Sequence, residues 1–173
     1  LATTQVEVRV NRGTGAVGFY DTNGLPLLTE KSGGGKTLTP AVVGGFGTLQ
    51  SRQTFDLAPG EAIYGLGQHQ SGVMNYRGTS VHLQQQNPGE SGIPVMVSSR
   101  GYGLLWDNPA ITDVDVGQSS STNLTWTSEA SDAIDYYFMY GPELDDVIAD
   151  YRKLTGAAPM FGKWAWGLWQ CKN

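Results

Sequence analysis

Short segments in which apolar and polar residues alternate occupy most of the first 140 residues. In residues 5–10, QVEVRV, valines alternate with polar side chains, which is the pattern of a strand with one buried face. Turn signals such as Asn23-Gly24 separate these segments. The pattern is typical of a mainly β, antiparallel β-sandwich. It predicts strands over residues 5–10, 16–20, 25–29, 48–57, 81–83, 93–98, 103–106, 123–127 and 133–140.

The pattern changes after residue 140. Residues 142–154 are predicted as a helix, because their apolar residues recur at helical spacing. Asp145 and Asp146 near its start suit the helix dipole, and Gly156 can end it. After this helix, residues 163–169, KWAWGLW, are predicted as one more strand with tryptophans on both faces.

Composition narrows the class of protein and of partner. The 173-residue chain has 24 glycines and only 16% charged residues, which suits a turn-rich β protein. A net charge of −5 and scattered basic residues argue against nucleic acid and membrane as partners. No apolar run reaches the roughly 18–20 residues of a membrane helix. The single cysteine leaves the compartment open; we favour a periplasmic or secreted location over a cytoplasmic one.

Few side chains form a recognisable catalytic motif. The carboxylates are spread along the chain, and we interpret them as solvated loop and edge residues and not as the pair, about 5–9 Å apart, of a glycosidase. His69 and His82 lack a third ligand, so we predict no metal site. Gly65-Leu66-Gly67 lacks the third glycine of a dinucleotide site, and no cofactor is predicted.

The polar run QQQNPGE, residues 84–90, is more informative. Its amide side chains can both donate and accept hydrogen bonds, which suits sugar hydroxyls. An ordinary solvated loop is the simpler interpretation of this segment taken alone.

Three stretches together resemble glycoside hydrolase family 31, the α-glucosidase and α-xylosidase family. They are AIYGLGQHQSGVMNYRG, IPVMVSSRGYGLLWDN and YYFMYGPELDDVIADYRKLTGAAPMFGKWAWGLWQCK. The resemblance implies a galactose-mutarotase-like sandwich over residues 1–140, which lacks its first strands, and a linker helix within 141–158. Residues 159–173 would then begin a truncated (β/α)8 catalytic barrel, with 163–169 as its first strand.

The same resemblance implies a site built from two segments of this chain. Gln85, Gln86 and Asn87 match a sandwich loop that reaches over the barrel mouth. Cys171, Lys172 and Asn173 follow the first barrel strand, at the face where barrel active sites lie. The catalytic carboxylates of the family lie further along the barrel, so we expect no catalytic residue in this chain and no activity from it alone. Its partners would be an oligosaccharide and the remainder of the barrel.

Two questions of function stay open at this point. The amino-acid sequences of the motifs favour an α-xylosidase. The alternative is an enzyme whose substrates are α-glucosides. The chain can alternatively be a non-catalytic binding module, which would need exposed aromatic platforms such as Trp106 or Trp126, or a purely structural sandwich.

Overall fold

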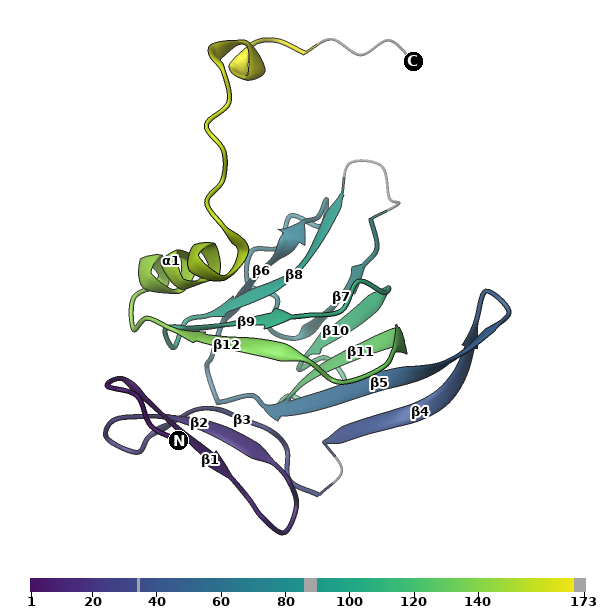
Figure 1. Ribbon diagram of the computed structural model, residues 1–173, viewed down its shortest axis with the longest axis vertical. Coiled ribbons are helices and arrows are strands. Elements are labelled where there is room, and N and C mark those ends of the chain that lie inside the picture. The colour runs from purple at the N-terminus through teal and green to yellow at the C-terminus, as the bar shows by residue number, and fades with distance from the viewer. Residues whose placement is uncertain (34, 86–89, 170–173) are drawn as a thin grey trace.

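The strands of the chain form three antiparallel sheets, followed by a helix and an extended arm (Figure 1). The computed structural model describes residues 1–33, 35–85 and 90–169. The first sheet has the order β1-β2-β3, the second β4-β5-β11-β10-β7, and the third β12-β9-β8-β6. The strands are β1 (Val6–Val10), β2 (Val17–Asp21), β3 (Pro26–Thr29), β4 (Lys36–Val43), β5 (Phe46–Asp56), β6 (Ile63–Gln68), β7 (Thr79–Leu83), β8 (Ser91–Ser98), β9 (Tyr102–Trp106), β10 (Thr112–Val116), β11 (Asn123–Ser131) and β12 (Tyr136–Tyr140).

The five-stranded and four-stranded sheets enclose the main core, which confirms the predicted mainly β sandwich. In the five-stranded sheet Val114 lies opposite both Val81 and Trp126 in the strand register, and all three are buried. Trp106 of the facing sheet stacks on Trp126, with 5.7 Å between ring centroids. Because successive residues of a strand point to opposite faces, polar residues such as Asp113 fall on the outer face.

Every predicted strand up to residue 140 is present, with its ends shifted by a few residues, but β4, β6 and β10 were not predicted. Pro40 lies inside β4, an edge strand where proline is tolerated. Glycines interrupt the pattern of β6. β10 reads TDVDV and alternates fully, so the sequence carried a usable signal for it.

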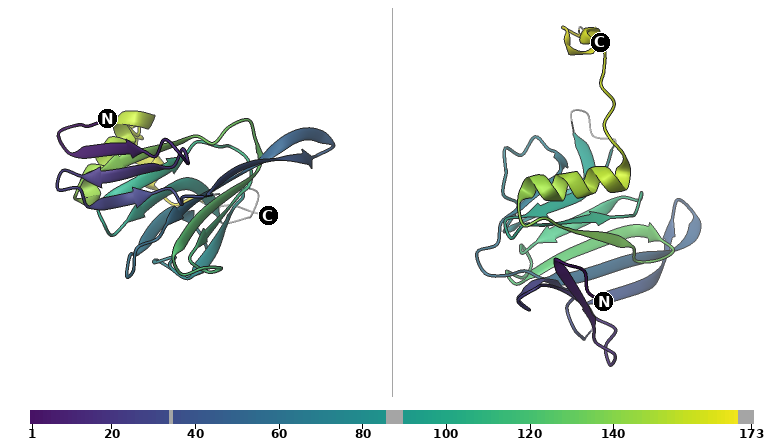
Figure 2. Two further views of the ribbon diagram at one scale, coloured as in Figure 1. Left: turned by 90° about the horizontal axis from the view of Figure 1, so that it is seen from below. Right: turned by 60° about the vertical axis from the view of Figure 1, so that its left-hand side comes forward.

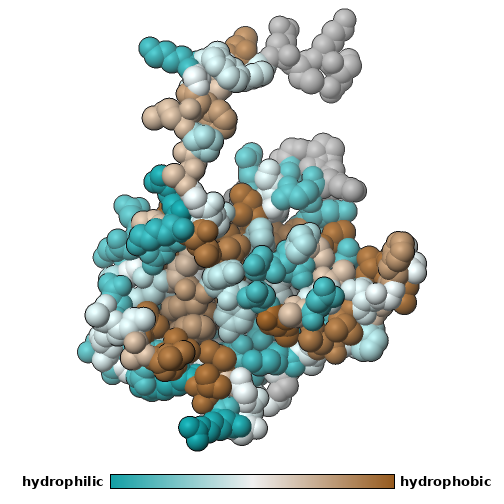
Figure 3. Space-filling model, in the orientation of Figure 1, coloured by the Kyte–Doolittle hydropathy of each residue, from teal (hydrophilic) through white to brown (hydrophobic). Residues whose placement is uncertain are grey.

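The hairpin of β4 and β5 carries apolar residues into solvent. Val42 is 74% exposed and Phe46 is 79% exposed. Figure 3 shows hydrophobic residues over this hairpin, at the right of the molecule. β4 pairs only with β5, so one side of the ribbon has no neighbouring strand among the described residues.

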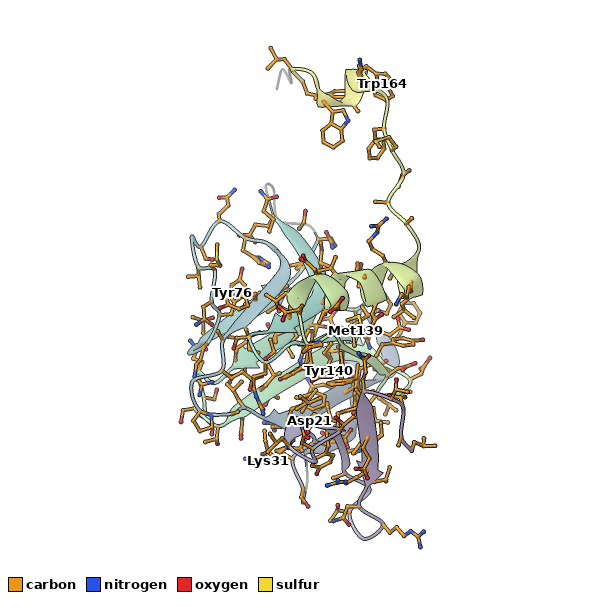
Figure 4. The ribbon with its side chains drawn as sticks, turned by 90° about the vertical axis from the view of Figure 1, so that its left-hand side faces the viewer. Asp21, Lys31, Tyr76, Met139, Tyr140 and Trp164 are labelled. Carbon is orange, nitrogen blue, oxygen red and sulfur yellow. The ribbon has the colours of Figure 1, made fainter. Side chains whose placement is uncertain are left out.

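Helix α1 (Leu144–Thr155) lies on the outer face of the four-stranded sheet (Figure 2). Its fully buried Val147 packs with Val95 and with Met139, which Figure 4 labels below the helix. A Cβ atom at Gly103 of β9 would lie 2.5 Å from Cγ1 of Val147, so the glycine permits this close approach. The helix begins two residues later than predicted, and the N–H of Gly156 donates to the carbonyl of Arg152 as expected of a C-cap.

The predicted strand over residues 163–169 is wrong for this chain. The arm beyond α1 leads away from the sandwich (Figures 1 and 2), and Lys163–Trp166 forms the 3-10 helix η1. A strand needs partner strands for its backbone groups, and none pairs with the described arm. Its N–H groups bond locally instead, as from Ala165 to the carbonyl of Gly162 at 3.0 Å.

Glu30 joins all three sheets through one carboxylate. Its side chain is 2% exposed. Oε2 accepts hydrogen bonds from the backbone N–H of Val17 in β2 at 2.8 Å and from Nζ of Lys36 in β4 at 2.7 Å. Oε1 accepts from the hydroxyl of Tyr136 in β12 at 2.8 Å. Burial, and then the charge of Glu30, raise the pKa of Tyr136, so the hydroxyl remains a donor.

His82 and Asp113 form a cross-strand pair on the outer face of the five-stranded sheet. They lie opposite each other in β7 and β10, with 2.7 Å between Nδ1 and Oδ1. Nε2 of His82 lies 3.3 Å from Oε1 of Gln84. The hydrogen bond with Asp113 raises the pKa of His82 above its ordinary value of 6.5.

None of the helices in the described ranges is long and apolar enough to cross a membrane.

Replacing Glu30 tests the junction of the sheets. We expect Glu30→Ala to lower the free energy of unfolding by about 3 kcal/mol, because it leaves the buried partners of the carboxylate unpaired. Urea denaturation measures this value. Glu7→Ala is the matched control, since the Glu7 side chain is 43% exposed and pairs with Arg9 at 2.7 Å. Equal changes in the two variants would contradict the role given to Glu30.

The His82 pair predicts a pH effect of known sign. NMR titration should place the pKa of His82 above 6.5, and Asp113→Asn should lower it. Because the folded-state pKa is raised, the stabilising contribution is complete below pH 6.5 and disappears as the pH rises through the folded-state pKa. The contribution is small, since the His82 side chain is 49% exposed. A His82 pKa unaffected by Asp113→Asn would show that the pair is absent in solution.

Candidate functional site

The expected sugar-binding residues fall only partly within the described structure. Gln86 and Asn87, and likewise Cys171, Lys172 and Asn173, lie outside the described residues. Gln85 is described and exposed, and its Nε2 donates a hydrogen bond to the backbone carbonyl of Gly92. Its role toward a sugar therefore stays a prediction.

A surface hollow of about 290 Å³ lies beside Gln85. Its lining residues include Gln84 and Gln85, which carry amide groups, and Pro94 and Pro109, which carry apolar rings. Leu83, Gly92, Asn108, Ala110, Ile111 and Thr112 complete it. Amides beside apolar surface can bind the hydroxyls and the C–H faces of a small polyol.

The other end of the polar run is tied to the loop between β6 and β7. Oε1 of Glu90 accepts a hydrogen bond from the backbone N–H of Gln70 at 3.4 Å, and Oε2 lies 3.8 Å from Nδ1 of His69. Nε2 of His69 lies 2.8 Å from the carbonyl of Leu66. His69 also meets the ring of Tyr76 edge to face; Figure 4 shows Tyr76 on the flank of the sandwich.

The ring nitrogens of both histidines face other groups of the protein. His69 meets Leu66 and Glu90, and His82 meets Asp113 and Gln84. Within residues 1–33, 35–85 and 90–169, no three histidine, cysteine or acidic side chains are grouped so as to hold a metal ion.

Two carboxylates interpreted as solvated are in fact buried, so that expectation is wrong for them. They are Glu30 and Glu61. Oε1 of Glu61 accepts hydrogen bonds from the hydroxyls of Ser98 and Tyr102, both at 2.5 Å, and Oε2 accepts from the N–H of Ala58 at 3.0 Å. Burial, and then the charge of Glu61, raise the pKa of Tyr102 well above its usual value. These oxygens are occupied by structural contacts, which isolated Glu residues do not signal in a sequence.

Trp106 and Trp126 cannot serve as the aromatic platforms of a glycan-binding module. Both are fully buried in the core. The exposed tryptophans lie instead on the arm, where Trp164, Trp166 and Trp169 are 69–75% exposed and line an apolar hollow with Phe161 and Ala165. Figure 4 shows Trp164 well away from the sandwich.

Proteins similar to this chain include α-xylosidases. An α-xylosidase from Saccharolobus solfataricus is 44% identical over 135 residues, which is 73% of this chain and 18% of that protein. The crystal structure of a family 31 α-xylosidase from a soil metagenome, complexed with xylose, matches with a TM-score of 0.81 and 29% identity. It covers 99% of this chain, which covers 30% of that one.

A dextranase of the same family gives an equally good structural match. The structure from Flavobacterium johnsoniae, complexed with isomaltotriose, has a TM-score of 0.81 and 28% identity over 95% of this chain and 20% of its own. The chain thus spans about a fifth to a third of the length of these proteins.

The sandwich itself carries the family assignment. The model of the glycosyl hydrolase 31 N-terminal galactose mutarotase-like domain matches residues 1–115. These residues include the whole first sheet and β4 to β9, and the structural matches extend over the remaining strands and α1. The chain therefore belongs to glycoside hydrolase family 31, and its sandwich is the N-terminal domain of that family.

Proposed function

We propose that this chain is the sandwich domain of an exo-acting α-glycosidase that releases α-linked xylose from oligosaccharides. The observation that carries the proposal is the 44% identity with the α-xylosidase from Saccharolobus solfataricus over 135 residues. The structural similarity to an α-xylosidase complexed with xylose supports the same substrate.

The proposed contribution of this chain is substrate binding. Gln85, Gln86 and Asn87 would form part of the pocket wall and donate or accept hydrogen bonds from sugar hydroxyls. Cys171, Lys172 and Asn173 would line the first sugar site at the end of a barrel strand. The hollow beside Gln85 supports this role, since it combines amide groups with apolar surface.

The chemistry would be supplied by the barrel. A retaining glycosidase uses one carboxylate as nucleophile and a second carboxyl group as acid and base, through a covalent glycosyl-enzyme. The buried carboxylates of this chain, Glu30 and Glu61, are held by structural hydrogen bonds and take neither role.

α-Glucosides are the second candidate substrates. The match to a dextranase complexed with isomaltotriose favours them. The two sugars differ by one hydroxymethyl group, which a pocket can reject by steric exclusion or accept with extra contacts.

Kinetics of the full-length protein test the substrate. We expect the kcat/KM for an aryl α-xyloside to exceed that for the matching aryl α-glucoside by about tenfold or more. The 173-residue chain alone should release no xylose, because it lacks the proposed catalytic carboxylates. A preference for the glucoside would replace the xylosidase proposal by its alternative, and xylose release by the chain alone would contradict the division of roles.

Replacing Gln85 tests the pocket wall. Gln85→Ala in the full-length protein should raise KM for the preferred substrate severalfold through lost hydrogen bonds. Gln118→Ala is the control, since Gln118 lies in the exposed loop after β10. Unchanged kinetics in Gln85→Ala would remove Gln85 from the site.

A further inference from the structure

The end of β6 has an unusual backbone conformation, which packing of the hydrophobic core does not explain. Gly65, Leu66 and Gly67 all have positive φ angles, of 95°, 61° and 100°. Positive φ is uncommon for leucine and costs free energy, so it persists only where the surrounding structure enforces it. The β6–β8 register shifts between Gly65 and Gly67, so this segment is a bulge.

The bulge brings β6 unusually close to the start of β8. Gly67 lies opposite Gly92 in the register, and a Cβ atom at Gly67 would lie 1.8 Å from the carbonyl oxygen of Ser91. The carbonyl of Leu66 is directed at Nε2 of His69, 2.8 Å away. Because a carbonyl oxygen only accepts, this nitrogen carries the proton.

His69 is thereby fixed with its other nitrogen toward Glu90. The His69 side chain is 9% exposed and is held by Leu66 on one side and by the ring of Tyr76 on another. Nδ1 lies 3.8 Å from Oε2 of Glu90, an ion-pair distance when the imidazole is protonated. The N–H of Gln70 donates to the second oxygen of Glu90.

Glu90 immediately precedes β8, where the polar run joins the sheet. Two residues later, the carbonyl of Gly92 accepts the hydrogen bond of the Gln85 side chain. A Cβ atom at Gly92 would lie 3.2 Å from Cα of Leu83, so the two stems of the run are in close contact. A displacement of Glu90 would therefore move the acceptor that orients Gln85.

We propose that His69 and Glu90 are positioning residues of the sugar site. The strained Leu66 carbonyl fixes His69, His69 fixes Glu90, and Glu90 fixes the β8 stem against which Gln85 is oriented. This gives the backbone strain at Leu66 a function. The inference rests on the proposed role of Gln85 in sugar binding and adds residues that need not touch the sugar.

Two variants of the full-length protein test the proposal by kinetics. His69→Phe keeps a ring against Tyr76 and removes both nitrogens; Glu90→Gln removes the charge. Each should raise KM for the preferred α-glycoside on the order of fivefold with kcat within about twofold of wild type. A merely structural defect would lower the amount of active enzyme, and so the apparent kcat, without changing KM. Glu7→Gln is the control, because Glu7 is an acidic residue that pairs with Arg9 within β1, in a different sheet from β6 and β8.

The double variant and hydrogen exchange complete the test. If both variants act by breaking the contact between His69 and Glu90, the double variant will raise KM by the same factor as each single variant. Independent effects would instead multiply. Amide exchange over residues 84–92 should quicken in both single variants and stay unchanged in Glu7→Gln. Unchanged KM with unchanged exchange would overturn the proposal. If the full-length protein cleaves no α-glycoside, the proposed function fails, and the exchange measurement alone decides whether His69 and Glu90 fix the stem.

Discussion

The architecture depends on one buried carboxylate. Glu30 accepts hydrogen bonds from three groups, and each belongs to a different sheet. Burying a charge is costly unless its hydrogen-bonding capacity is filled, and the three sheets fill it only when they are assembled together. Phe19 of the first sheet stacks on Phe138 of β12 with 4.1 Å between ring centroids, so apolar packing supports the same junction.

Glycines permit the close approach of helix α1 to the four-stranded sheet and of β6 to β8. Gly103 lets Val147 bring helix α1 onto the sheet, and Gly67 and Gly92 bring the end of β6 against the start of β8. The helix sets the point from which the arm leaves. The arm leads away from the sandwich on the side where β6 ends and β8 begins (Figure 1).

The sequence predicted those features whose cause is local. Period-two alternation located the strands of the sandwich, and helical spacing with Gly156 located α1. It did not reveal the junction, because nothing near Glu30 in the chain indicates that Tyr136 and Lys36 meet it. The tryptophan-rich segment was predicted as a strand from its alternation alone, yet a strand also requires neighbours, and Lys163–Trp166 forms a 3-10 helix here. The site was predictable in part: Gln85 came from its amide-rich context, whereas His69 depends on a bulge visible only in three dimensions.

We propose that the family 31 sandwich contributes to the wall of a sugar pocket that a barrel completes. The most direct measurement is a crystal structure of the full-length protein with the sugar released from its preferred substrate bound. We expect Gln85 to lie at the pocket, with the stem of β8 held by His69 and Glu90. A sugar bound by barrel residues alone, with Gln85 remote from it, would contradict this role of the sandwich.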